Sequence, residues 1–72
     1  MPQNAEWKII HMAHTEKHAK IILDALQNEG FYVRCRRVFK SLSFADNYFE
    51  IMVLSTEAVE AQQWLIENNL LL

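Results

Sequence analysis

The chain has very little glycine, proline and cysteine, with one residue of each among 72. A single cysteine, Cys35, cannot form an internal disulfide, which excludes a disulfide-stabilised scaffold and suits a reducing compartment. Hydrophobic residues make up 51% of the chain, and this content with so little Gly and Pro excludes a disordered or low-complexity protein. The sequence therefore predicts one small compact domain over residues 1–72.

Long apolar runs and an excess of positive charge are also missing. No run approaches the ~18 apolar residues of a membrane-spanning helix, and the amino end lacks a signal-peptide pattern, so we expect a cytoplasmic protein without a membrane partner. The formal net charge of −2 provides no general attraction to polyanions. This balance disfavours nucleic acid as a partner.

Hydrophobic periodicity and turn signals predict five regular segments in the order strand, helix, strand, strand, helix. Residues 47–54 are predicted to be the central strand of a sheet, because large side chains occupy both of its faces. Thr15 and Glu16 predict the start of the first helix, and Gly30 predicts its end after Glu29. Ser55 and Thr56 predict the start of the second helix. The other two strands are expected over residues 6–14 and 31–39, with a loop over residues 40–46.

The first strand leaves two choices for its buried face, because its alternation is imperfect. One face would carry Trp7, Ile9, His11 and Ala13, and the other Lys8, Ile10, Met12 and His14. We favour burial of the first face, because Trp7 and Ile9 carry the larger apolar area.

The order of these segments predicts an α+β fold with two layers. A right-handed strand-helix-strand crossover makes the first two strands parallel, and the following hairpin makes the third antiparallel to the second. Placing the third strand between the other two satisfies both conditions. The result is a split β-α-β fold (βαββα) with sheet order 1-3-2 and both helices on one face.

Several segments together, I-I-H-M-A-H, the helix ending in Q-N-E-G, F-Y-V-R-C, F-E-I-M-V-L and S-T-E-A-V-E-A-Q-Q-W-L, give the chain a family resemblance over about residues 7–69. It resembles the small bacterial prokaryotic signal transducing protein family and related short Firmicute proteins. These proteins have a trimmed ferredoxin-like fold, without the last strand, akin to the nitrogen-regulatory PII proteins. The resemblance implies a non-enzymatic binding or regulatory role and transfers no functional residues or cofactor.

We expect a self-associating interaction or regulatory module, with a homo-oligomer or protein partner and no enzymatic activity, cofactor or metal. The open face of the sheet and an apolar loop supply the candidate interaction surface. On the open face we expect a cross-strand ion pair between Glu50 and an arginine. The candidate surface comprises Tyr32, Arg34, Arg36, Leu42, Phe44, Tyr48, Glu50 and Met52.

The alternative function is binding of a small anion or single-stranded nucleic acid through a face carrying Arg34, Arg36 and Arg37. Basic side chains interleaved with aromatic ones on an open sheet can contact phosphates and stack bases. The acidic net charge and Glu50 on the same face oppose this reading. Arg37 also falls where an apolar residue is due, so we expect the strand to twist, bulge or leave the covered region there.

Two further groups could carry chemistry. His11, His14 and His18 cluster at one strand-to-helix turn and could ligate a metal, although only His14 and His18 are expected to converge, because His11 and His14 point to opposite faces of a strand. Solvated or core-edge histidines are the simpler interpretation. Cys35 alternates with Phe31 and Val33, which predicts a buried, unreactive thiol.

Overall fold

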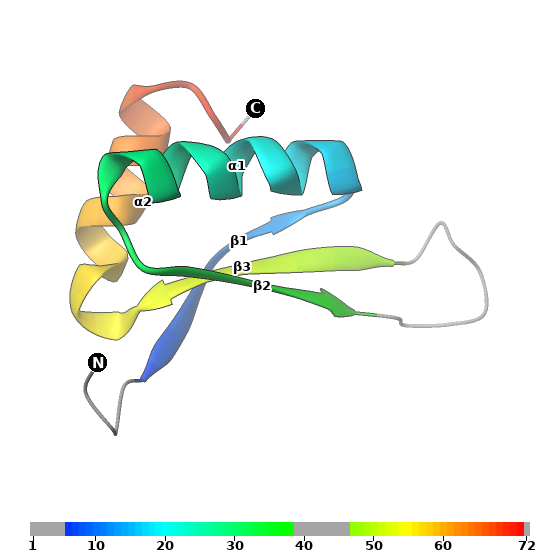
Figure 1. Cartoon of the computed structure of the whole chain (residues 1–72), viewed down its shortest axis with the longest axis horizontal. Coiled ribbons are helices and arrows are strands. Elements are labelled where there is room, and N and C mark those ends of the chain that lie inside the picture. Colours follow the sequence, from blue (N-terminus) through cyan, green and yellow to red (C-terminus); the bar gives the residue numbers. More distant parts are fainter. Residues whose placement is uncertain (1–5, 39–46, 72) are drawn as a thin grey trace.

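A computed structural model describes residues 6–38 and 47–71 of the chain. Its elements are β1 (Trp7–Ala13), α1 (Glu16–Glu29), β2 (Val33–Val38), β3 (Tyr48–Leu54), the 3-10 turn η2 (Ser55–Glu57) and α2 (Ala58–Glu67). The three described strands form one sheet in the order β1-β3-β2, and β3 pairs antiparallel with both neighbours. Both helices lie over one face of the sheet (Figure 1). The predicted βαββα arrangement with order 1-3-2 is thereby confirmed.

Local chemistry sets both ends of α1. The Thr15 hydroxyl accepts a hydrogen bond from the backbone N–H of His18 at 3.1 Å, which satisfies one of the free donors of the first turn. Gly30 has a φ of 104°, which an L side chain rarely adopts. From there Gly30 N–H donates to Gln27 O and Phe31 N–H to Leu26 O, a C-terminal cap that satisfies two free carbonyls. Both predicted ends of α1 are confirmed.

The second helix begins later than its sequence signals predict. Ser55 and Thr56 lie in η2, and no side-chain hydrogen bond caps either η2 or α2. The Ser55 backbone N–H instead donates to the carbonyl of Glu6 at 2.9 Å, which ties the end of β3 to the start of β1. Among the helices within residues 6–38 and 47–71, none is long and apolar enough to cross a membrane.

A β-bulge in β1 explains its imperfect alternation. Ile9 pairs with Met52 and His11 with Ile51, so Ile10 is the extra residue between two consecutive β3 partners. The bulge reverses the alternation, and Ile10 becomes buried while Ile9 is 42% exposed. The favoured face is therefore wrong for Trp7 and Ile9, which precede the bulge, and correct for Ala13, which follows it.

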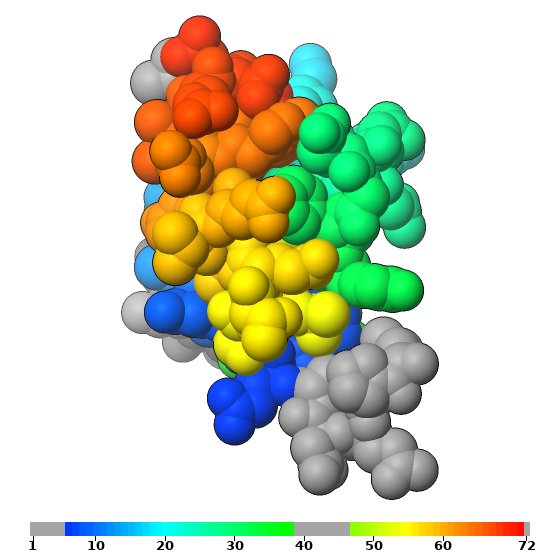
Figure 2. Space-filling model, turned by 90° about the vertical axis from the view of Figure 1, so that its left-hand side faces the viewer, coloured from blue at the N-terminus to red at the C-terminus, as the bar shows by residue number. Residues whose placement is uncertain are grey.

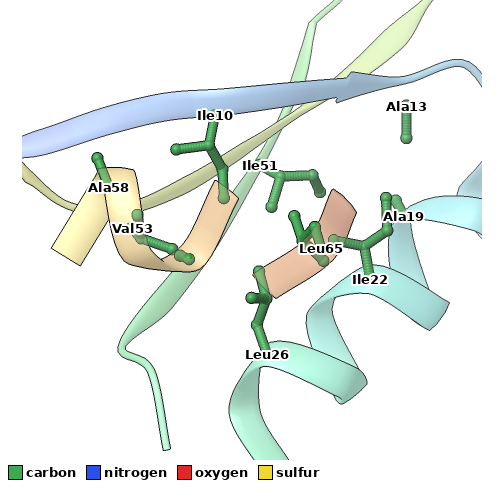
Figure 3. Packing of buried hydrophobic residues seen from close by; sticks show 10 residues of the cluster. Ile10, Ala13, Ala19, Ile22, Leu26, Ile51, Val53, Ala58 and Leu65 are labelled. Carbon is green, nitrogen blue, oxygen red and sulfur yellow. The ribbon is translucent and has the colours of Figure 1, made fainter. Parts of the chain in front are cut away.

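The hydrophobic core lies between the helices and the sheet (Figure 3). Ile51 and Val53 of β3 are fully buried beneath Ile22 and Leu26 of α1 and Leu65 of α2. Four alanines are buried in this core together with the larger side chains. Figure 2 shows α2 beside the last turns of α1, where the rings of Phe31 and Trp64 lie 6.4 Å apart. The ten buried residues of the core are Ile10, Ala13, Ala19, Ile22, Leu26, Ile51, Val53, Ala58, Ala61 and Leu65.

The segment after α2 packs back on the core. Leu70 and Leu71 are partly buried against it, and the Leu70 N–H donates to Leu65 O at 3.0 Å. The Leu70 carbonyl also lies 3.0 Å from Nε2 of His18 in the first turn of α1. The end of the described chain is thus fixed to the helix that begins after β1.

Ile51 provides the sharpest test of this core. A chain of this size is stabilised by only about 4–11 kcal/mol in total, and replacing a fully buried isoleucine by alanine costs about 2–5 kcal/mol. We expect Ile51→Ala to lower the free energy of unfolding by that amount in urea denaturation followed by circular dichroism. Ile51→Val should cost about 0.5–1.5 kcal/mol, which keeps the test measurable if the alanine variant does not fold.

Val59→Ala is the matched control, because Val59 is 77% exposed on α2. It should change the free energy of unfolding by less than about 0.5 kcal/mol. Equal costs for the Val59 and Ile51 variants would contradict the position of the core.

Candidate interaction surface

The face of the sheet turned away from the helices, here called the open face, is defined by the strand register. Residues on alternate positions of β3 and their directly paired neighbours share this side. The described residues of the open face are Trp7, Ile9 and Met12 of β1, Arg34, Arg36 and Val38 of β2, and Tyr48, Glu50, Met52 and Leu54 of β3.

Apolar side chains dominate the β1 side of the open face. Ile9 is 42% exposed and Met12 is 51% exposed, and Met52 lies beside Ile9 in the register. Single exposed apolar residues are normal, but a contiguous group on an uncovered sheet is typical of an interaction site. The sequence prediction included Met52 and Tyr48 but did not include the three β1 residues. The bulge turns Trp7 and Ile9 outward against the favoured face, whereas Met12 lies on the side that this face left unburied.

An ion pair occupies the centre of the open face. Arg36 and Glu50 are directly paired in the register, and Nε and Nη2 of Arg36 lie 2.7 and 2.5 Å from Oε1 of Glu50. The Glu50 side chain is only 9% exposed, whereas that of Arg36 is 64% exposed. A carboxylate this deeply buried depends on its partner, because its desolvation is otherwise uncompensated. The expected cross-strand pair is confirmed.

The three arginines of β2 do not share one face. Arg34 lies on the open face, with its guanidinium carbon 4.8 Å from the centre of the Trp7 ring. Arg37 pairs with Phe49 on the helix-facing side and lies 5.6 Å from the centre of the Phe49 ring. Since Arg36 is bound to Glu50, the proposed joint face of Arg34, Arg36 and Arg37 is not formed. Strand alternation separates Arg37 from the other two.

The three histidines gather differently from the sequence prediction. The rings of His11 and His18 meet edge to face, with centroids 5.6 Å apart, because His11 pairs with Ile51 and so lies on the side of the sheet that faces α1. The expectation that only His14 and His18 converge is therefore wrong. Burial lowers the pKa of His11 below 6.5, and the electrostatic effect of the neighbouring His18 and His14 lowers it further. His11 is thus a neutral imidazole at pH 7, at the edge of the core.

A hollow opens beside these histidines at the end where β1 stops and β3 begins. It is lined by His11, Met12, His14 and Tyr48 and has a volume of about 620 Å³. That volume lies within the range of small-molecule sites. Among the residues that the structure describes, however, no group of three or more His, Cys, Asp or Glu side chains is placed to hold a metal ion.

Cys35 differs from its prediction. It faces the helix layer by register, opposite Ile51, yet it is exposed, because β2 is an outer strand that the helices cover only in part. Partial burial raises the pKa of its thiol, which keeps it protonated at pH 7 and therefore a weak nucleophile. The expectation of a buried thiol is wrong.

The remaining candidate residues are placed only in part. Tyr32 precedes β2, is 56% exposed, and its backbone N–H donates to Oε1 of Glu57 at 3.4 Å. Leu42 and Phe44, the apolar loop residues of the predicted surface, lie outside the described residues. The described surface therefore consists of the open face and the exposed outer strand β2.

The Arg36–Glu50 pair yields a stability prediction. Arg36→Leu leaves the Glu50 carboxylate buried without its cation, and we expect a loss of about 1–3 kcal/mol of unfolding free energy in urea titrations. The double variant Arg36→Leu with Glu50→Leu should recover most of that loss, because no charge is then left buried. A double variant as unstable as the sum of both single variants would show that the pair is not coupled.

His11 yields a pH prediction. Its pKa in the folded state is lowered, so the unfolded state binds the proton more readily. The contribution of His11 to the free energy of unfolding is therefore fully present above about pH 6.5 and is lost as the pH falls below it. We expect the slope of unfolding free energy against pH to lie well below the one-proton limit of about 1.4 kcal/mol per pH unit, because His11 is only half buried. His11→Phe, which keeps an aromatic ring beside His18, should flatten the slope between pH 6.5 and 5.

His14→Asn is the control, because His14 is exposed and removing it should leave most of the slope in place. A slope that is unchanged in His11→Phe would assign the acid sensitivity to other groups.

Comparison with known proteins adds no relative. No protein-family model, no curated protein and no solved structure matches this chain. The resemblance to the signal transducing protein family therefore stays a prediction from the sequence pattern. Any function has to be argued from the described surface.

Proposed function

We propose that this chain is a small non-enzymatic interaction module, of the regulatory kind that its sequence resemblance implies, and that it self-associates through the open face of its sheet. The single observation that carries the proposal is the uncovered apolar area on that face. Ile9 and Met12 are exposed there, and Met52 continues the patch onto β3.

A second copy of the same face is the occupant that its charges favour. The central charges of the face, Arg36 and Glu50, already neutralise each other within one copy. Two such faces related by a two-fold axis would therefore bring apolar side chains together without burying a new unpaired carboxylate. Two sheets packed in this way, about 10 Å apart, would form a four-layer sandwich with helices outside.

The size of the face sets the expected strength. Three strands of about seven residues cover roughly 23 Å by 14 Å, which is smaller than the roughly 800 Å² per partner of a standard interface. We therefore expect association in the micromolar range. The cytoplasmic location expected from the sequence belongs to the same proposal.

The alternative, binding of a small anion or single-stranded nucleic acid, has weaker support. It needs Arg34, Arg36 and Arg37 on one surface, and Arg37 lies on the other side of β2 from Arg34. Arg34 and Arg36 could still contact a phosphate from the open face, but Glu50 offsets part of their charge.

Sedimentation velocity between about 5 and 500 μM tests the proposal. We expect the average mass to rise toward that of a dimer across this range, and Ile9→Lys to hold the protein monomeric, because a charge would then be buried in the interface. Circular dichroism checks that the variant is folded.

Val59→Lys is the matched control on α2, where Val59 is 77% exposed, and it should associate as the original protein does. A strict monomer at the highest concentration would refute self-association. Loss of association in Val59→Lys alone would move the contact to the helix layer.

A further inference from the structure

The outer edge of β2 is a second unoccupied surface, distinct from the open face. Among the described strands β2 pairs only with β3, so one side of its backbone carries peptide groups without a neighbouring strand. The four central residues of β2 are all exposed. Such an edge is a template for an added strand.

The other edge of the sheet is less suited to this. β1 contains the bulge at Ile10, and a bulge interrupts the regular spacing of donors and acceptors that an added strand needs. The β2 ladder, by contrast, runs in unbroken register from Val33 to Val38. The regular edge is therefore the one on β2.

The charges of β2 oppose pairing with a second copy of the same strand. Arg34, Arg36 and Arg37 make up half of its residues. Directly opposed residues of two antiparallel β2 strands share one face of the sheet, so near-centred pairing would place Arg34 of each copy opposite Arg36 of the other, or the two Arg36 residues opposite each other. Like charges in directly opposed positions are destabilising. The edge is thus protected against self-pairing.

None of the described strands of this chain is acidic enough to serve as the partner strand of β2. Their only carboxylate is that of Glu50, which lies on the central strand and is bound to Arg36. The charges of the described strands therefore favour a complementary strand from a different protein.

We infer that the outer edge of β2 docks an extended acidic segment of another protein, which adds to the sheet as a fourth strand. Side chains on one face of a strand repeat every second residue, so carboxylates at alternate positions would meet Arg34 and Arg36 together. In the free chain Arg34 lies over the Trp7 ring of β1 and Arg36 contacts Glu50 of β3, so both guanidinium groups lie on the inner side of β2 and have to turn toward the outer edge to meet an incoming carboxylate. Because Glu50 already offsets part of the charge of Arg36, Arg34 is expected to contribute more of the attraction to an incoming carboxylate.

The test uses the whole chain and an end-blocked, fluorescein-labelled peptide of alternating glutamate and threonine residues. Fluorescence anisotropy at low salt should show binding that weakens as salt is raised. The same peptide with lysine in place of glutamate should not bind. A third peptide is N-methylated at alternate residues, whose N–H groups point to one edge of the extended chain. It keeps every charge but loses the backbone donors of that edge, and it should bind at least about tenfold more weakly. Equal binding of the methylated and unmethylated peptides would overturn the inference, because charge alone would then explain it.

Variants assign the binding to β2. Arg34→Ser should weaken the binding of the glutamate peptide by about threefold, which corresponds to the loss of one cross-strand charge pair. Lys20→Ser removes the same charge from an exposed position of α1 and should leave the affinity unchanged. Arg36 is not substituted, because its loss would also leave the buried Glu50 carboxylate without its ion-pair partner. Equal effects of the two variants would contradict docking at β2.

Cys35 supplies a readout that does not depend on charge. It is the only cysteine of the chain and is exposed in the middle of β2. Saturating peptide should slow its alkylation by iodoacetamide, because an added strand covers this edge, whereas an unchanged rate would place the peptide elsewhere. Ile9→Lys should leave peptide binding intact, so the outcome is independent of self-association.

Discussion

The pairing of β3 along both of its edges is the constraint on which the rest of the structure depends. Because β1 and β2 both hydrogen-bond to this strand, its register assigns every strand residue to the helix layer or to the open face. Ile51 and Val53 come to lie under the helices. Glu50, the residue before Ile51 in the sequence, is turned to the opposite side and meets Arg36. One strand thus carries both the centre of the core and the centre of the exposed face.

The features that sequence reasoning predicted correctly are those determined by near neighbours. The ends of α1 follow from the hydroxyl of Thr15 and the backbone freedom of Gly30, which act within one turn. Sheet order follows from short connections and the handedness of the crossover. The features that it missed depend on distant partners: the bulge at Ile10 exists only in the register with β3, and the exposure of Cys35 depends on how far the helix layer extends over β2.

The two surfaces proposed for binding differ in chemistry, and this difference separates their partners. The open face offers Ile9, Met12 and Met52 around a charge pair that is already neutralised, so desolvation favours an apolar, self-complementary contact. The β2 edge offers backbone groups flanked by arginine, so the backbone hydrogen bonds and the charge of an added strand determine what can bind there. Occupying the edge would not cover the β1 side of the open face. A module with this layout can join a copy of itself while it holds a different chain.

The sheet order also has a consequence for the way in which the chain folds. Residues 39–47 separate β2 from β3, whereas residues 14–47 separate β1 from β3. Closing the longer loop, roughly four times the length of the shorter one, costs about 1 kcal/mol more in chain entropy. The hairpin therefore has the kinetic advantage, and β1, the earliest of the three described strands in the chain, has to wait for β3 before it acquires its described neighbour. Until then Ile10 and Ala13 stay outside the core, and the bulge has no partner strand against which to form.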